Sequence, residues 1–175
     1  MTIRAALLAV ALSLVLAAPA AADGPVRDHV EIHNPVRDAG EHCGFPVLWD
    51  IHISADRKRY YDDAGRLTKE VVQVSEENTV TNLATGKTLR DGPVRFTRIH
   101  HYEDGQRVRT VDSGVMLNVV DGAGERLRDV GRVEYRILPD GRWEIFEMDG
   151  VHPAYAALDG NTFGAVLSVF CGVLD

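Results

Sequence analysis

Apolar and polar residues alternate with a period of two at the start of the main body of the chain. From Phe45 to Ile53, apolar residues occupy every second position, and Leu48 is the one apolar residue in the polar phase. A period of two is typical of a β-strand that buries one face and exposes the other. We therefore predict a strand here, with Val47, Trp49 and Ile51 on its buried face.

After this strand, β-rich runs separated by short turn signals follow one another as far as Met148. These signals are Asp63–Gly65, Thr85-Gly86, Asp91-Gly92, Glu103–Gly105, Asp121–Gly124 and Pro139–Gly141. Asp-Gly between alternating flanks is a strong hairpin signal, and no run has the length and period of a crossover helix. The sequence predicts an all-β fold: an antiparallel up-and-down meander of about eight to ten strands, closed or nearly closed into a barrel, because closure removes exposed edges. A two-sheet β-sandwich is the alternative.

The last part of the chain has a different pattern. Asn161 can cap a helix, and apolar residues follow at helical spacing at Phe163, Val166, Leu167 and Phe170. A short C-terminal helix is therefore predicted.

The first residues have the features of an export signal. Residues 1–22 contain a short basic start, an apolar run from Ala5 to Ala18 and small residues before the predicted cleavage site between Ala22 and Asp23. The apolar run is shorter than the ~20 residues that cross a bilayer. The mature protein is therefore predicted to be secreted, with no membrane attachment after cleavage. We interpret residues 23–42 as a polar N-terminal leader with one short strand, and residues 43–175 as a single β-barrel-like domain.

Cys43 and Cys171 are the only cysteines of the chain. Export permits disulfide formation, and the absence of a CxxC spacing argues against redox catalysis or a zinc finger. We predict one disulfide that joins the start of the domain to its end. Two unpaired buried thiols are the alternative.

Charge and composition exclude several classes of function. The chain has 19 Lys and Arg against 26 Asp and Glu, and removal of the segment that contains Arg4 makes the balance more acidic. This balance argues against nucleic acid and against anionic lipid as partners. His29 and His33 would share one face of a strand, but nothing matches an HExxH or a Cys-His motif. We predict no cofactor and no metal.

One hairpin can be examined residue by residue. If Leu138 pairs with Arg142 around Pro139–Gly141, then Ile137 lies with Trp143, and Tyr135 lies near Ile145 on the apolar face. Arg136 would pair with Glu144 on the opposite face. The same register places Glu147 on the apolar face next to Val133. Such a carboxylate is either a ligand contact or the end of a strand that reaches solvent.

The candidate ligand-binding residues are the inward aromatic residues and this one carboxylate: Trp49, Tyr135, Trp143 and Glu147. Small barrels either hold one small molecule or fill with side chains, so plain core packing is the alternative. No nucleophile elbow or phosphate loop is present, and the catalytic residues are unknown. Asp50 and His52 share a strand face and could form an acid–base pair, but those positions also fit a polar outer face. We therefore expect a secreted protein that binds a small apolar or amphipathic ligand. The alternatives are a small barrel enzyme of isomerase or cyclase type, which would use Glu147 or Tyr135, and a cavity-free extracellular interaction protein.

Two short motifs carry a resemblance to a known group. Cys43-Gly44-Phe45-Pro46-Val47 opens the β-region, and Phe170-Cys171-Gly172-Val173-Leu174 closes the chain. With the meander between them, the chain resembles uncharacterised small secreted β-barrel-like proteins of actinobacteria and related soil bacteria. The resemblance covers most of the mature chain. It implies a disulfide and a barrel-like fold, and it brings no catalytic residues.

Overall fold

The structure of the protein is a computed structural model, and it describes residues 24–120, 124, 126–138, 140–153 and 170–175. Residues 170–174 form one short helix. The predicted signal peptide with its cleavage site and the predicted helix cap Asn161 lie outside the described residues. The strands are β1 (Val26–Asp38), β2 (Val47–Tyr61), β3 (Leu67–Asn82), β4 (Thr88–Glu103), β5 (Gln106–Val120), β6 (Arg126–Ile137) and β7 (Trp143–Val151).

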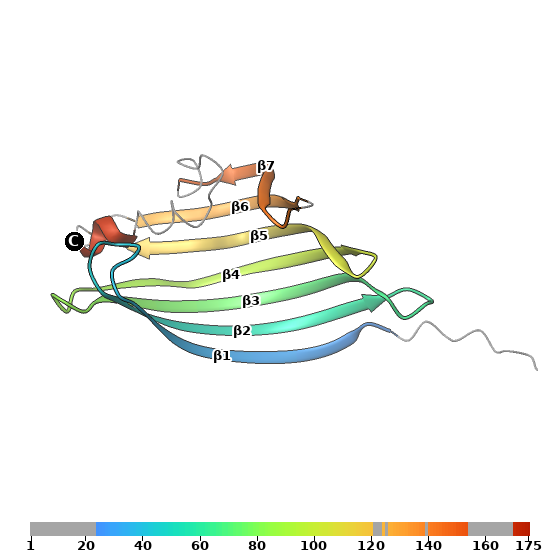
Figure 1. Cartoon of the computed structure of the whole chain (residues 1–175), viewed down its shortest axis with the longest axis horizontal. Helices are drawn as coiled ribbons and strands as arrows, with labels where there is room; N and C mark the ends of the chain where they lie inside the picture. The colour runs from blue at the N-terminus through green and yellow to red at the C-terminus, as the bar shows by residue number, and fades with distance from the viewer. Residues whose placement is uncertain (1–23, 121–123, 125, 139, 154–169) are drawn as a thin grey trace, which may run out of the picture.

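All seven strands belong to one antiparallel sheet in the order of the sequence (Figure 1). The predicted meander is therefore confirmed. The predicted barrel is wrong, because β1 and β7 are the two edges of the sheet and do not contact each other. The alternative sandwich is also wrong for the described strands, since they form a single sheet. No helix among the described residues is long and apolar enough to span a bilayer.

Within the described residues, the strands are fewer and longer than predicted, for a local reason. Asp91-Gly92 does not form a turn but lies inside β4, where Gly92 has a φ of 119° and the pairing with β3 shifts at Asn78. This β-bulge resembles a hairpin signal in the sequence, because both features need a glycine. The segment predicted as a leader with a short strand contains β1, which pairs with β2 from Val26 to Asp38.

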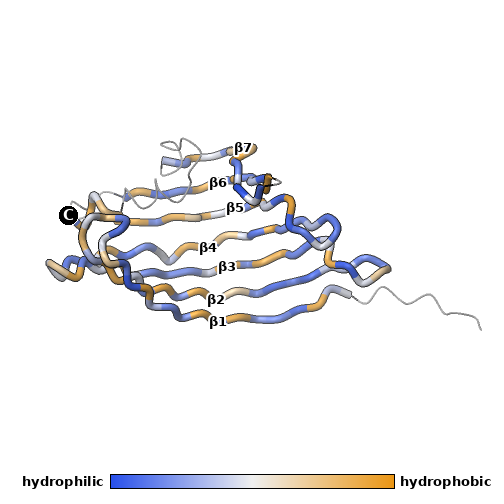
Figure 2. The backbone as a smooth tube through the Cα atoms, viewed as in Figure 1, coloured by the Kyte–Doolittle hydropathy of each residue, from blue (hydrophilic) through white to orange (hydrophobic). Residues whose placement is uncertain are grey.

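Hydrophilic and hydrophobic segments follow one another along the strands (Figure 2). Because successive side chains of a strand point to opposite faces, the two faces of the sheet differ in chemistry. We call the face that carries Trp49, Val80 and Leu117 the inner face, because its side chains line a cavity. The opposite, outer face carries mainly charged and hydroxyl side chains, such as His33, Asp50 and their neighbours. The period of two that predicted the Phe45–Ile53 strand therefore identifies the buried side correctly.

One cluster of the apolar core lies at one end of the inner face. It contains seven buried residues: Val47, Val80, Leu89, Leu117, Val119, Phe170 and Leu174. Further buried apolar residues, such as Val72, Val133 and Tyr135, lie along the rest of the sheet. The C-terminal helix covers this end, and the predicted disulfide is confirmed, with the Cα atoms of Cys43 and Cys171 5.1 Å apart. A disulfide of this kind indicates an oxidising compartment.

The β6–β7 hairpin confirms most of its predicted register. Ile137 pairs with Trp143, Tyr135 with Ile145 and Arg136 with Glu144. The predicted face of Glu147 is wrong: a register shift after Glu134 inserts one extra residue into β7, and Glu147 pairs with Glu134 on the outer face. One inserted residue moves every later side chain to the other face. Glu147 is 55% exposed there and accepts a hydrogen bond from Arg132 at 2.7 Å.

Candidate functional site

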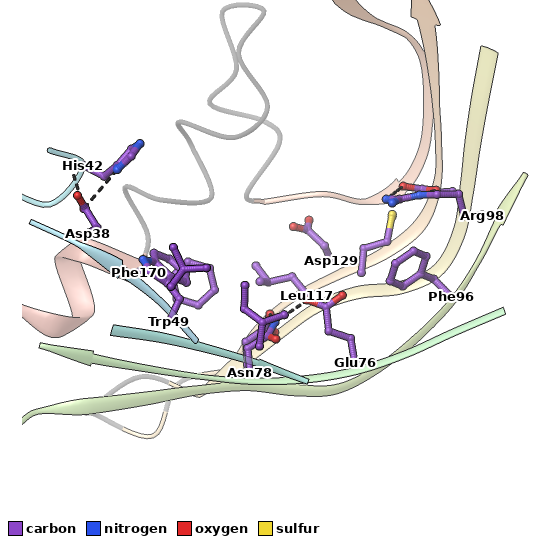
Figure 3. Close-up of a pocket in the computed structure, with 15 residues that line it drawn as sticks. Asp38, His42, Trp49, Glu76, Asn78, Phe96, Arg98, Leu117, Asp129 and Phe170 are labelled. Atoms are coloured by element: carbon purple, nitrogen blue, oxygen red, sulfur yellow. Dashed lines mark hydrogen bonds and ion pairs between the residues drawn. The ribbon is translucent and has the colours of Figure 1, made fainter. Parts of the chain in front are cut away.

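A cavity of about 570 Å³ lies on the inner face, between the C-terminal helix and the middle of the sheet. Its volume is within the range of small-molecule sites, roughly 300–1,000 Å³. Figure 3 shows Trp49 and Phe170 at one end of this cavity, Phe96 and Arg98 at the other, and Asn78 between them. The cavity therefore has chemically different regions along its length.

The first region is apolar and aromatic. Trp49 and Phe170 meet edge to face, with ring centroids 5.2 Å apart and planes at 75°. Val36, Ile51 and Leu117 extend this wall. The strand alternation directs Trp49 and Ile51 to the inner face, and the C-terminal helix places Phe170 against them. This end can hold the apolar part of a small molecule.

The middle region is polar and arises from the bulge in β4. Asn78 lies opposite Asp91 in the β3–β4 pairing. The Nδ2 of Asn78 donates to Glu76 Oε1 at 2.5 Å and to Asp91 Oδ2 at 3.4 Å, while the backbone N–H of Asn118 donates to Asp91 Oδ1 at 3.0 Å. The three side chains therefore form one connected group on the cavity floor.

Asp91 carries the buried carboxyl of this group. Asp91 is 5% exposed, and burial raises the pKa of its carboxyl above the usual value. The hydrogen bond from the Asn118 backbone opposes this rise, and the negative charge of Glu76 adds to it. A carboxyl group that keeps its proton to a higher pH can donate a hydrogen bond or act as a general acid.

Arg98 and Asp112 form a two-pronged ion pair at the far end of the cavity. Arg98 donates from Nε to Asp112 Oδ1 at 2.8 Å and from Nη2 to Oδ2 at 2.7 Å. The carboxylate is almost fully buried, whereas the arginine side chain is 41% exposed. The Arg98 guanidinium also lies 5.2 Å from the centre of the Phe96 ring. This pair balances its own charge, and Asp38 of the same lining lies 3.2 Å from His42, Oδ2 to Nδ1.

Asp129 of β6 borders the cavity beside these groups (Figure 3). It is fully buried, and its Oδ1 lies 3.8 Å from Nδ1 of His152. The other ring nitrogen of His152 is 3.1 Å from the backbone carbonyl oxygen of Asp149. The described lining thus contains one arginine, one histidine (His42, beside Asp38) and five carboxylate residues: Asp38, Glu76, Asp91, Asp112 and Asp129. The cavity favours positive charge or hydrogen-bond donors.

The predicted ligand-binding residues do not form one site. Trp49 lines the cavity, but Tyr135 and Trp143 pack against each other further along the inner face, with centroids 6.0 Å apart. Trp143 is 41% exposed, and the Arg107 guanidinium lies 4.5 Å from the centre of its ring. Glu147 is on the outer face. Ligand binding by these residues stays a prediction. Of the four, only Trp49 lines the cavity.

Sequence reasoning missed the polar residues of the cavity. Asn78, Asp91 and Asp129 occupy positions on the inner face, in the phase that their strands otherwise fill with apolar residues such as Val80, Leu89 and Leu127. A polar residue in the apolar phase was the available signal. The bulge in β4 hid this signal for Asp91, because an inserted residue breaks the period of two, whereas β3 and β6 keep their period through Asn78 and Asp129.

Outside the cavity, three side chains with metal-ligand atoms lie together on the outer face of β1 and β2. They are His33, Asp50 and His52, and they form the one such group of three within the described residues. No family model, curated protein or solved structure shows significant similarity to this chain.

Proposed function

We propose that this chain is an exported binding protein that holds a small amphipathic ligand in the cavity on the inner face of its sheet. The observation that carries the proposal is that the cavity wall has an apolar part and a polar part. The Trp49–Phe170 end is aromatic, and the floor beside it carries Glu76, Asn78 and Asp91. Sites for small molecules commonly combine an apolar lining with a few convergent polar groups.

The floor favours an amphipathic ligand over a purely apolar one. A hydrocarbon that covered Glu76 and Asp91 would remove water from polar groups without giving them new partners, which costs free energy. A ligand with an ammonium or another donor group would instead supply a charge-assisted hydrogen bond. Its apolar part would then lie against Trp49 and Phe170.

Export of the protein is part of the proposal. It is supported by the signal-like pattern of residues 1–22 and by the disulfide, which belongs in an oxidising compartment. The resemblance to small secreted bacterial proteins agrees with it.

Native mass spectrometry of the secreted protein is the first test, since a bound ligand would appear as added mass. Affinity can then be measured with three ten-carbon probes that differ only in the head group: decylamine, decanol and decanoate. In a Trp143→Phe background, Trp49 is the only tryptophan and reports on the cavity. We expect decylamine to bind best and decanoate worst.

Neighbouring glutamates of β3 provide a matched pair of variants. Glu76 lines the cavity, whereas Glu77 is on the outer face and 52% exposed. Glu76→Gln should reduce the preference for decylamine over decanol, and Glu77→Gln should leave it unchanged. If none of the probes changes Trp49 emission and the secreted protein carries no added mass, the binding proposal fails.

The raised pKa of Asp91 favours an enzyme as the second candidate, of the isomerase or cyclase type. A protonated Asp91 would act as general acid on a ligand held by the Trp49 end. Incubating the co-purified ligand with the protein and following its conversion by chromatography tests this candidate. Asp91→Asn should stop conversion while binding remains. A ligand recovered unchanged after incubation with the wild-type protein would leave only the binding function.

A further inference from the structure

A second group of side chains converges on the outer face, on the opposite side of the sheet from the cavity. His33 of β1 and His52 of β2 are directly opposite each other in the pairing, and Asp50 lies two residues before His52 on the same face. The two imidazole rings are stacked, with centroids 4.1 Å apart and planes at 17°. The register of one hairpin thus brings all three together.

The Nε2 atoms of both histidines approach the same carboxylate oxygen. Asp50 Oδ1 is 2.7 Å from Nε2 of His33 and 3.5 Å from Nε2 of His52. Across the group, the ligand atoms all lie within 4.8 Å of one another. Two ligands at the usual 2.0–2.1 Å from a tetrahedral zinc ion are separated by about 3.4 Å. The His52–Asp50 distance already fits, and the His33–Asp50 distance needs to open by about 0.7 Å.

We propose that His33, His52 and Asp50 bind a divalent transition-metal ion of the zinc class between the edge strand β1 and its neighbour β2. Two imidazoles and one carboxylate are donors that suit zinc and copper, whereas calcium and magnesium prefer oxygen ligands alone. Three protein ligands leave a position for water. The proposal is independent of the cavity and its ligand.

The surroundings leave room for an ion and favour its charge. The side chains of His33, Asp50 and His52 are 60%, 40% and 54% exposed. A shallow hollow of about 350 Å³ adjoins the two histidines, and the carboxylates of Glu31 and Glu77 line it. An ion can therefore reach the group from solvent without opening the sheet.

The sequence does not show this site as a motif. The ligands come from two strands and are brought together by cross-strand register, so they have no fixed short spacing such as HExxH. In the sequence, the signals that bear on metal binding are motifs and the shared strand face of His29 and His33. Cross-strand register adds the argument for His33, Asp50 and His52.

His29 on the same face is a matched control. Its Nδ1 is 2.9 Å from Asp56 Oδ1 and its Nε2 is 2.7 Å from Glu31 Oε1. Because the two ring nitrogens face different carboxylates, these groups do not converge on one point. Replacing His29 removes one imidazole from the outer face of β1 and leaves the proposed ligands in place.

Isothermal titration of the untagged mature chain with zinc sulfate, in a buffer that does not chelate metals, tests the proposal. Both cysteines form the disulfide, so thiolates do not contribute to binding. We expect one ion per chain and a higher melting temperature with zinc, because the ion would join β1 to β2. Magnesium chloride should give no comparable binding.

Three variants decide the outcome. His33→Gln and His52→Gln should each weaken zinc binding by more than about tenfold, while His29→Gln should bind as the wild type does. Circular dichroism without metal checks that each variant keeps its sheet. The proposal is overturned if the wild type does not bind zinc, if His52→Gln binds as tightly as the wild type, or if His29→Gln loses as much affinity as the other two.

Discussion

Trp49 and Phe170 pack edge to face, although Trp49 belongs to β2 and Phe170 to the C-terminal helix. Other contacts hold the helix at this place. Asn82 Nδ2 donates to the backbone carbonyl of Leu174 at 3.1 Å, and Cys171 is bonded to Cys43. The apolar end of the cavity is therefore built by two distant parts of the chain, and the disulfide fixes their relative position.

Removing the disulfide should destabilise the protein and loosen this end of the cavity. The bond closes a loop over a sequence separation of 128 residues, for which the chain-entropy model gives about 5 kcal/mol as an upper value. We expect Cys43→Ser/Cys171→Ser to lower the free energy of unfolding by about 2–5 kcal/mol, measured by urea denaturation. In a Trp143→Phe background, the emission of Trp49 should also shift to the red. An unchanged urea midpoint would show that the covalent bond is not needed to hold the helix.

The sequence was sufficient for the features that depend on neighbouring residues. The alternation around Trp49 identifies the buried face of β2, because the period of a strand is fixed by its pleat. The turn between Leu138 and Arg142 sets the register that pairs Tyr135 with Ile145. The disulfide could be predicted because only two cysteines are present.

The predictions that were wrong concern features that depend on single inserted residues or on the combined twist of many strands. The extra residue in β7 moves Glu147 to the outer face, and the bulge at Gly92 merges two predicted strands into β4. Whether a sheet closes depends on the number, tilt and stagger of its strands together. None of these follows from alternation alone. Asp91 was missed for the same reason, since it adjoins the bulge in β4.

The ion pair of Arg98 and Asp112 should matter more for stability than its exposed arginine suggests. Arg98→Met would leave the carboxylate of Asp112, which is 2% exposed, without its guanidinium partner. Loss of one partner from a buried pair costs about 3–5 kcal/mol. We expect a decrease of this size in the free energy of unfolding, measured by urea denaturation at pH 7.

Two further variants control this prediction. Arg95→Met removes an exposed arginine from the outer face of the same strand and should change stability by less than about 0.5 kcal/mol. Arg98→Met/Asp112→Leu removes both charges and should recover much of the loss. If the double variant is as unstable as Arg98→Met alone, the unpaired charge is not the cause.

Gly131 should tolerate no side chain. It pairs with Gly114 on one side and with Gly150 on the other, and its φ is 147°. A Cβ atom there would lie 2.1 Å from the carbonyl oxygen of Asp149 and 2.9 Å from Nε2 of His152. We expect Gly131→Ala to lower the free energy of unfolding by about 3 kcal/mol or more. It should also displace His152 from Asp129.

Gly141 gives the comparison for this substitution. It also has a positive φ, 83°, but a Cβ atom there would meet nothing within 4 Å. Gly141→Ala should therefore lower the free energy of unfolding by only about 1–2 kcal/mol, the cost of a left-handed backbone conformation for a residue with a Cβ atom. Thermal denaturation of both variants separates the two effects. Equal losses would mean that the close approach of β6 and β7 is not a constraint.

His100 should make the protein less stable as the pH falls from neutrality. The residue is 7% exposed, and its Nδ1 is 2.8 Å from the hydroxyl of Thr110. Burial, followed by the positive charges of Arg107 and Arg98, lowers the pKa of His100 to about 4. In the unfolded chain, a histidine has a pKa of about 6.5. Between these two values the unfolded state binds more protons than the folded state, so the free energy of unfolding decreases as the pH falls.

His100→Gln keeps a group that can bond to Thr110 but does not titrate. The difference in unfolding free energy between wild type and variant should change by up to about 3 kcal/mol between pH 7 and pH 4, in favour of the variant at low pH. Taking the difference cancels the other titrating groups, including His29, whose pKa is raised by Asp56 and Glu31 and whose contribution has the opposite sign. Urea denaturation at pH 7, 5.5 and 4 measures it. A difference that stays constant across this range would show that His100 is protonated equally in the folded and unfolded chains, and its burial would then not control the acid stability of the sheet.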